Sequence, residues 1–128
     1  MQNKVVLHYV DGRIVKGTTD DFSAIKETFH IKEVGSGSVE QVSLTGMKAV
    51  FFVKDFTGDA THQERNDGER TGFGKKIRVV YHDGETQFGY TQGFAPNRPG
   101  FFLFPVDAGS NNERIFIVTR AASEIQFV

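Results

Sequence analysis

The sequence predicts an all-β protein built from two copies of one small unit. A shift of 72 positions aligns residues 4–34 with residues 76–106 without a gap, and nine of the 31 aligned pairs are identical. An Asp-Gly pair follows the first apolar run in both copies, as in a β-hairpin. Apolar residues spaced three and four apart, the helical pattern, are confined to one short segment. A repeat of this kind predicts a structural unit that occurs twice.

Five short strands are expected in the first copy, at residues 4–10, 13–19, 28–34, 40–44 and 49–53. Asp11 and Gly12 are expected to form a two-residue turn, because a primed turn needs positive φ at both central positions, which glycine accepts and aspartate tolerates. The alternation along a strand then places Val5, Leu7 and Tyr9 on one face, which we expect to be core.

The second copy repeats this order, with strands expected at residues 76–82, 85–91, 100–106, 113–118 and 124–128. Asp83 and Gly84 mark its first hairpin. Gly17 and its counterpart Gly89 stand in mid-strand, where a missing side chain permits a sharp bend or the close approach of another backbone. Bent strands favour closure into a small barrel. Residues 21–28 (DFSAIKET) are the candidate for a short helical turn.

The repeat also predicts the domain organisation: a first barrel at residues 1–56, a polar glycine-rich linker at 57–75 and a second barrel at 76–128. A linker of this composition is typical of a mobile tether. A unit of about 60 residues buries only about 60% of its unfolded surface, so a second copy offers a further interface. Residues 49–53 (AVFFV) are apolar on both faces, and we therefore expect Phe51 or Phe52 to pack against the second barrel.

This pattern resembles the Sm-like barrel, a small five-stranded fold of the Src-homology type. The match lies in a strand followed by Asp11-Gly12-Arg13, a glycine four residues after the arginine, and a short turn before the last strand. The resemblance implies two tandem Sm-like barrels. Sm proteins read RNA bases with an asparagine in the third-strand motif and with an Arg-Gly pair after the fourth strand. The corresponding places here hold Thr28 and Thr45-Gly46, so the RNA-reading residues are not retained there.

A second resemblance covers nearly the whole chain. Residues 51–56 (FFVKDF), 96–105 (PNRPGFFLFP) and 111–116 (NNERIF) are similar to the motifs of an uncharacterised bacterial domain family. Members of that family are often found beside signalling modules. The resemblance implies a regulatory setting and brings no established activity.

Charge and composition exclude several classes of function. The net charge is −1 and is evenly spread, which counts against nucleic-acid binding, because phosphate neutralisation favours a basic patch. The chain has no cysteine, so it has neither a disulfide nor a thiolate metal site. Its longest apolar run, residues 49–53, is far shorter than the roughly 20 residues of a membrane span. The amino-terminal residues lack a signal-peptide core, and we expect a cytoplasmic protein.

The motifs of common enzyme classes are not found in the sequence. The four histidines, at positions 8, 30, 62 and 82, do not have the spacing of metal ligands. No glycine-rich loop introduces a helix, and no serine stands in a nucleophile elbow. We therefore expect a non-catalytic protein without a metal or a cofactor.

The proline-rich loop of the second copy holds the first candidate site. Pro96 and Pro99 fix their own φ and favour extended conformations before them, which holds Asn97 and Arg98 outward. A preorganised arginine beside an asparagine can bind a phosphate or a carboxylate. The alternative is a stiff loop in which Arg98 bonds a neighbouring carbonyl.

The linker holds the second candidate site. Arg65 and Arg70 resemble the arginine pair with which PilZ domains bind cyclic di-GMP, and residues 42–46 (VSLTG) are similar to the second motif of those domains. The arginines here are five positions apart rather than four, and they follow the second motif instead of preceding it.

Three classes of function remain open. The first is a non-catalytic regulatory or interaction module of a bacterial cytoplasmic signalling protein, with a protein or an adjoining domain as its partner. The second is Sm-like binding of RNA or single-stranded nucleic acid, and the third is nucleotide sensing of the PilZ kind.

Overall fold

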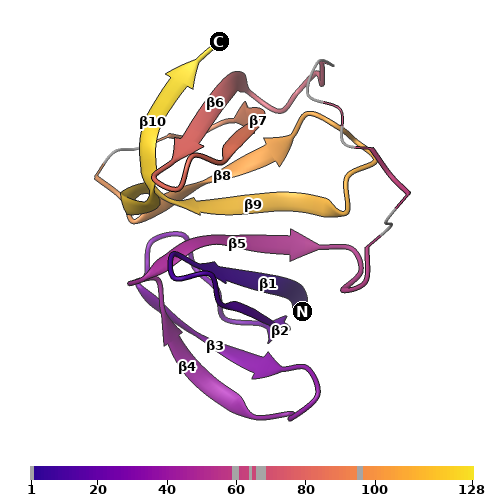
Figure 1. The fold of residues 1–128 in the computed structure, drawn as a ribbon, viewed down its shortest axis with the longest axis vertical. Coiled ribbons are helices and arrows are strands. Elements are labelled where there is room, and N and C mark those ends of the chain that lie inside the picture. The colour runs from indigo at the N-terminus through magenta and orange to yellow at the C-terminus, as the bar shows by residue number, and fades with distance from the viewer. Residues whose placement is uncertain (1, 59–60, 64, 66–68, 95–96) are drawn as a thin grey trace.

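A computed structural model describes residues 2–58, 61–63, 65, 69–94 and 97–128. Its strands are β1 (Asn3–Tyr9), β2 (Ile14–Thr19), β3 (Thr28–Glu33), β4 (Val39–Ser43), β5 (Met47–Val53), β6 (Lys75–Tyr81), β7 (Thr86–Thr91), β8 (Gly100–Pro105), β9 (Asn112–Val118) and β10 (Ala122–Phe127). All ten strands belong to one antiparallel sheet (Figure 1). The described helical structure consists of the 3-10 turn η1 (Thr119–Ala121), and no described helix has the length and apolar character to cross a membrane.

The two halves of the sheet have the same strand order. The first half runs β5-β1-β2-β3-β4 and the second runs β10-β6-β7-β8-β9. The prediction of an all-β fold is therefore confirmed. The prediction of two separate Sm-like barrels is not confirmed, because β5 pairs with β9 as well as with β1 and joins the halves in one open sheet. In Figure 1 the indigo-to-magenta half and the orange-to-yellow half meet along these two strands.

The residue register repeats together with the strand order. Val5 lies opposite Gly17 in the first hairpin, and Ile77 lies opposite Gly89 in the second, 72 positions later. The last strands follow the same rule with a shift of 75 positions, since Val5 also pairs with Phe52 and Ile77 with Phe127. The paired strand residues of the second half therefore have definite counterparts in the first, and the change of shift from 72 to 75 reflects a longer loop between β8 and β9 than between β3 and β4.

The Asp-Gly turns differ from the two-residue turns that the sequence predicts. The Gly12 N–H donates to the Tyr9 carbonyl (3.1 Å) and the Tyr9 N–H donates to the Arg13 carbonyl (3.0 Å), which encloses a loop of three residues. Positive φ occurs at Gly12 (95°) and at Gly84 in the second hairpin (90°), and at no described non-glycine residue. The Asp11 carboxylate accepts the Arg13 N–H (3.0 Å). Each Asp-Gly pair therefore ends a three-residue hairpin loop whose last residue is a left-handed glycine. An Asp-Gly pair fits this loop as well as it fits the two-residue turn that the sequence predicts.

Gly17 and Gly89 lie where a neighbouring strand passes very close. A Cβ atom at Gly17 would stand 2.5 Å from the Lys32 carbonyl oxygen, and one at Gly89 would stand 2.4 Å from the Phe104 carbonyl oxygen. These contacts involve backbone atoms, which cannot move aside as a flexible side chain can. Of the two roles considered for these glycines, close backbone approach is the one that the contacts show.

The short helical turn expected at residues 21–28 is reduced to a single turn, in which the Lys26 N–H donates to the Ser23 carbonyl (3.3 Å), and no helix forms there. The Asp21 carboxylate accepts the Thr19 hydroxyl (3.2 Å) and the His30 N–H (2.9 Å), which ties the start of the loop to two strands. The Phe22 ring packs edge-on against Phe29 (5.1 Å between centroids). Tertiary contacts of these two residues thus outweigh the weak local helical preference.

The hydrophobic core consists of two clusters, one in each half, and each cluster takes side chains from the other half. The second-half cluster includes four residues of the first half, which are Val6, Ala49, Phe51 and Val53. The first-half cluster includes two residues of β9, which are Phe116 and Val118. Neither half therefore completes its core alone.

Candidate functional site

The junction of β5 and β9 is where the two halves bind each other. All seven residues of β5 are buried, because the strand is covered on both faces and paired on both edges. Phe51 belongs to the second-half core, and the Phe52 ring lies 5.7 Å from the Phe102 ring of β8. The Arg114 guanidinium of β9 lies over the Phe52 ring at 4.4 Å and over the Phe102 ring at 4.8 Å. Both phenylalanines that the sequence singled out thus contact the second half.

A single lysine interrupts the apolar sequence of β5. The β1–β5 ladder pairs His8 with Ala49 but Tyr9 with Met47, so Lys48 is left out of the pairing as a bulged residue. A β-bulge turns the side chain of the extra residue away from its regular direction. Here the bulge directs the lysine across the junction.

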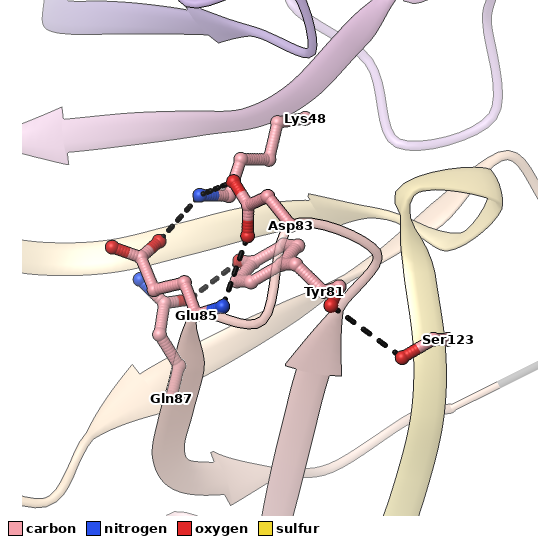
Figure 2. Close-up of polar contacts among 6 residues, drawn as sticks. All are labelled: Lys48, Tyr81, Asp83, Glu85, Gln87 and Ser123. Carbon is pink, nitrogen blue, oxygen red and sulfur yellow. Dashed lines mark hydrogen bonds and ion pairs between the residues drawn. The ribbon is translucent and has the colours of Figure 1, made fainter.

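Lys48 binds the first hairpin of the second half, as Figure 2 shows. Its Nζ lies 2.8 Å from Asp83 Oδ2, 2.6 Å from Glu85 Oε1 and 4.5 Å from the centre of the Tyr81 ring. The Tyr81 hydroxyl donates to Gln87 Oε1 (2.5 Å) beneath the lysine. The lysine side chain is only 11% exposed, whereas the two carboxylates are about half exposed. We call Lys48, Asp83 and Glu85 the lysine clamp.

The electrostatics of the lysine clamp favour the charged ion pair. Burial by itself would lower the pKa of Lys48, but the hydrogen bonds and charges of Asp83 and Glu85 outweigh burial and raise it. The hydrogen bond from Lys48 lowers the pKa of Asp83. Burial raises the pKa of Tyr81, so this phenol stays protonated as a donor. The ion pairs thus favour the protonated form of Lys48, which joins the two halves.

The clamp has no equivalent set of charges in the other half. The counterpart of Lys48 is Ser123, which is the bulged residue of β10 and whose hydroxyl donates to the Val80 carbonyl (3.1 Å). The counterpart of Glu85 is Arg13, which pairs with Asp11 at 3.0 Å. The clamp therefore distinguishes the internal junction from the rest of the sheet.

The two outer strands, β4 and β10, are the second notable feature. Among the described strands, each pairs on one side only, β4 with β3 and β10 with β6. The β4 residue Val39 is 65% exposed and the β10 residue Phe127 is 55% exposed, which is unusual for large apolar side chains in a sheet. By the repeat register, β4 is the counterpart of β9 and β10 is the counterpart of β5. β4 and β10 thus hold the same places in their halves as β9 and β5, but their outer edges are not paired with a described strand.

The structure places Asn97 and Arg98 on the surface of the second half. Both side chains are exposed, and Pro96 lies outside the described residues. Arg98 lines a pocket of about 210 Å³ together with Gln92, Phe102 and other residues. Binding of a phosphate or a carboxylate by Asn97 and Arg98 stays a prediction.

The described linker residues are bonded to the second half. The His62 ring lies 2.7 Å from the Asp107 carboxylate, which also accepts the Arg65 N–H at 3.1 Å. The Arg70 guanidinium donates to the Pro105 carbonyl (2.8 Å) and lies over an aromatic ring. The two arginines of the PilZ comparison are thus held by different acceptors. These bonds hold His62, Arg65 and Arg70 against the second half, and the division of the chain into two units with a mobile tether at residues 57–75 stays a prediction.

Sequence reasoning missed the lysine clamp and the outer strands. A single lysine in the otherwise apolar sequence of β5, residues 47–53, is a signal that was present. The sequence explains Asp83 as a turn residue, and no local pattern indicates that a distant lysine reaches Asp83 or Glu85. In the described residues, no three His, Asp or Glu side chains are grouped so as to hold a metal ion.

Comparison with known proteins identifies a family whose function is unknown. Residues 1–128 match the model of a family described as a family of unknown function (DUF6982). No curated protein and no solved structure matches the chain.

Proposed function

Because the chain belongs to this family of unknown function, we propose its function from its geometry: a non-catalytic interaction module that binds an extended protein segment along β4. The observation that supports the proposal is the free side of this strand, which lies at the end of the sheet. A sheet edge binds an added strand through main-chain hydrogen bonds, and the side chains of that strand provide specificity.

The backbone of β4 has donors and acceptors available for such a strand. Leu44 donates to the Glu27 carbonyl (2.8 Å) and Glu33 donates to the Ser38 carbonyl (2.9 Å), which identifies the residues whose polar groups face β3. Since these groups alternate along an antiparallel strand, the N–H and C=O groups of Val39 and Gln41 face outward.

The side chains of β4 leave this edge accessible. Proteins commonly protect an edge strand with lysine or proline, and β4 (VEQVS) contains neither. It has one charged residue, Glu40, and its first residue is the exposed Val39. This composition supports an edge that accepts a strand.

The finer architecture and setting are part of the same proposal. We propose that each half descends from one Sm-like unit, which the repeated strand order and register support. The resemblance of residues 51–56, 96–105 and 111–116 to a bacterial family beside signalling modules supports a cytoplasmic regulatory role. The partner is then another protein or an adjoining domain.

Selection of peptides from a displayed random library tests the proposed edge. Purified protein at low concentration is used as bait, with Gln41→Pro as the edge-blocked variant and Glu40→Ala as the control. Proline removes the outward N–H of residue 41 without removing a bond to β3. Glu40→Ala changes a neighbouring side chain and keeps every backbone donor. Far-UV circular dichroism and thermal unfolding establish that each variant is folded.

We expect selected peptides with alternating apolar residues to bind the wild type and Glu40→Ala at least tenfold more tightly than Gln41→Pro. Peptides that bind a folded Gln41→Pro variant as well as the wild type would contradict binding at β4.

A further inference from the structure

We infer that the strand bound by β4 is β10 of a second copy of this chain, so that copies associate head to tail. This inference rests on the proposed function, because it names the occupant of the same edge. It is supported by the internal junction, where the counterparts of these two strands already pair.

The register of the proposed contact follows from the repeat. β9 corresponds to β4 and β5 corresponds to β10, both with a shift of 75 positions. Transferring the β5–β9 pairs to the outer strands therefore predicts these pairs between copies: Glu124 with Val42, Ile125 with Gln41, Gln126 with Glu40 and Phe127 with Val39.

The hydrogen-bonding groups of the two edges match in this register. The Val128 N–H donates to the Lys76 carbonyl (3.1 Å) and so faces β6. Alternation along the ladder then turns the polar backbone groups of Ile125 and Phe127 away from β6. Their predicted partners, Gln41 and Val39, are the β4 residues whose backbone groups face outward. The free donors and acceptors of both edges thus meet.

The side chains are compatible as well. The exposed rings and methyl groups of Phe127 (55%) and Val39 (65%) would lie opposite each other and leave water together. Gln126 lies opposite Glu40, where an amide can donate to a carboxylate. Like charges opposite each other would oppose pairing, and none of the predicted pairs contains two like charges.

This contact would be weaker than the internal junction. Ser123 replaces Lys48, so the lysine clamp has no equivalent between copies. Glu40 and Gln41 stand where β9 has Ile115 and Phe116, so less apolar surface is buried. We therefore expect reversible association that depends on concentration. Because the two surfaces differ, the contact is heterologous and leads to a ring or an open filament.

Sedimentation velocity measures whether the full chain associates. The wild type is expected to shift to larger species as its concentration rises. Val39→Lys and Gln41→Pro on β4, and Phe127→Ser on β10, should each raise the concentration needed at least tenfold. Ile14→Lys is the control, because Ile14 is also an exposed apolar residue (56%) but lies on the inner strand β2.

Cysteine cross-linking tests the register and the direction, since the chain has no cysteine of its own. Glu40→Cys protein is mixed with Gln126→Cys protein and oxidised. These positions form a non-hydrogen-bonded pair, whose Cα separation of about 4.5 Å permits a disulfide. Replacing Gln126→Cys with Glu124→Cys moves the thiol by two residues and serves as the control. We expect the mixture with Gln126→Cys to cross-link at least tenfold faster than this control.

The outcomes separate this inference from the proposed function. A chain that stays monomeric at all concentrations, or Glu40→Cys molecules that cross-link only with each other, would overturn head-to-tail pairing. Binding of selected peptides to β4 would leave the proposed function standing in either case. A monomer that also selects no β4-dependent peptide would overturn both.

Discussion

Lys48 shows how one residue joins two halves of a repeated sheet. Its strand is otherwise apolar, and its side chain is nearly buried between the halves. A buried ammonium needs paired charges, and Asp83 and Glu85 provide them at 2.8 Å and 2.6 Å. The counterpart Ser123 bonds a carbonyl within its own half. Both halves thus have a bulge at the same place, but the bulged residue joins the halves in β5 and bonds within its own half in β10.

The lysine clamp predicts a pH-dependent contribution to stability. Asp83 has a lowered pKa in the folded state, so its contribution is present above the ordinary value of 3.8 and is lost as the pH falls through the lower folded value. Lys48 has a raised pKa, so its contribution is present below 10.5 and is lost as the pH rises through the higher folded value. The full contribution is therefore expected between these limits.

Lys48→Met is expected to lower the free energy of unfolding by about 1 kcal/mol near pH 7, a modest value because both carboxylates are half exposed. Urea denaturation at a series of pH values measures the difference from the wild type. The difference should shrink below pH 3.8 and above pH 10.5. Lys54→Met is the control, since Lys54 donates to the Ala108 carbonyl. A difference independent of pH would contradict the ion pair.

At the scale of the element, β5 and β10 are counterparts in different environments. β5 pairs on both edges and is buried throughout, whereas β10 pairs with β6 alone among the described strands, and all six of its residues are exposed or partly exposed. Their sequences reflect the difference: apolar residues fill β5 on both faces, and polar residues alternate in β10. The same position can therefore be compared in a buried and an exposed setting.

Phe52 and Phe127 occupy that same position. Phe52→Ala is expected to cost about 3–5 kcal/mol of stability, because it removes a buried ring between the halves. Phe127→Ala should cost less than about 1 kcal/mol in the monomer, because the ring is already 55% exposed. Chemical denaturation of both variants at low protein concentration measures the two values. Equal losses would contradict the difference in burial.

At the scale of the whole molecule, the two halves share hydrophobic core residues across their junction. The second-half core contains four residues from the first half. The Asn111 side chain also bonds the Asp55 backbone across the halves: its Oδ1 accepts the Asp55 N–H (3.1 Å) and its Nδ2 donates to the Asp55 carbonyl (2.8 Å). Separation would expose apolar surface on both sides of the junction.

Fragments of residues 1–58 and 59–128 are therefore expected to lack a cooperative thermal transition when alone. Mixing them should restore the transition, because β5 and β9 pair again and complete both cores. Circular dichroism and one-dimensional proton NMR follow the recovery. Two fragments that each unfold cooperatively, with no change on mixing, would contradict a shared core. A mixture that stays unfolded would show that linkage of the fragments is also required.

The strands, the repeat and the apolar faces were determined by the sequence itself. The ten predicted strands agree with the observed ones to within about two residues, because alternation and turn residues act between near neighbours. The burial of Val5, Leu7, Ile77 and Val79 follows from the same alternation. Because the pattern occurs in both copies of the repeat, each of these predictions is supported twice.

The tertiary structure alone decided how the halves meet. β5 pairs with β9 across the junction, between residues more than 55 positions apart in sequence, and no local pattern specifies which strand edges meet. Lys48 and Asp83 are 35 positions apart in sequence, so their contact exists only once the halves pair. The unpaired edges of β4 and β10 follow in turn, since a strand is left outermost only when the whole order is set.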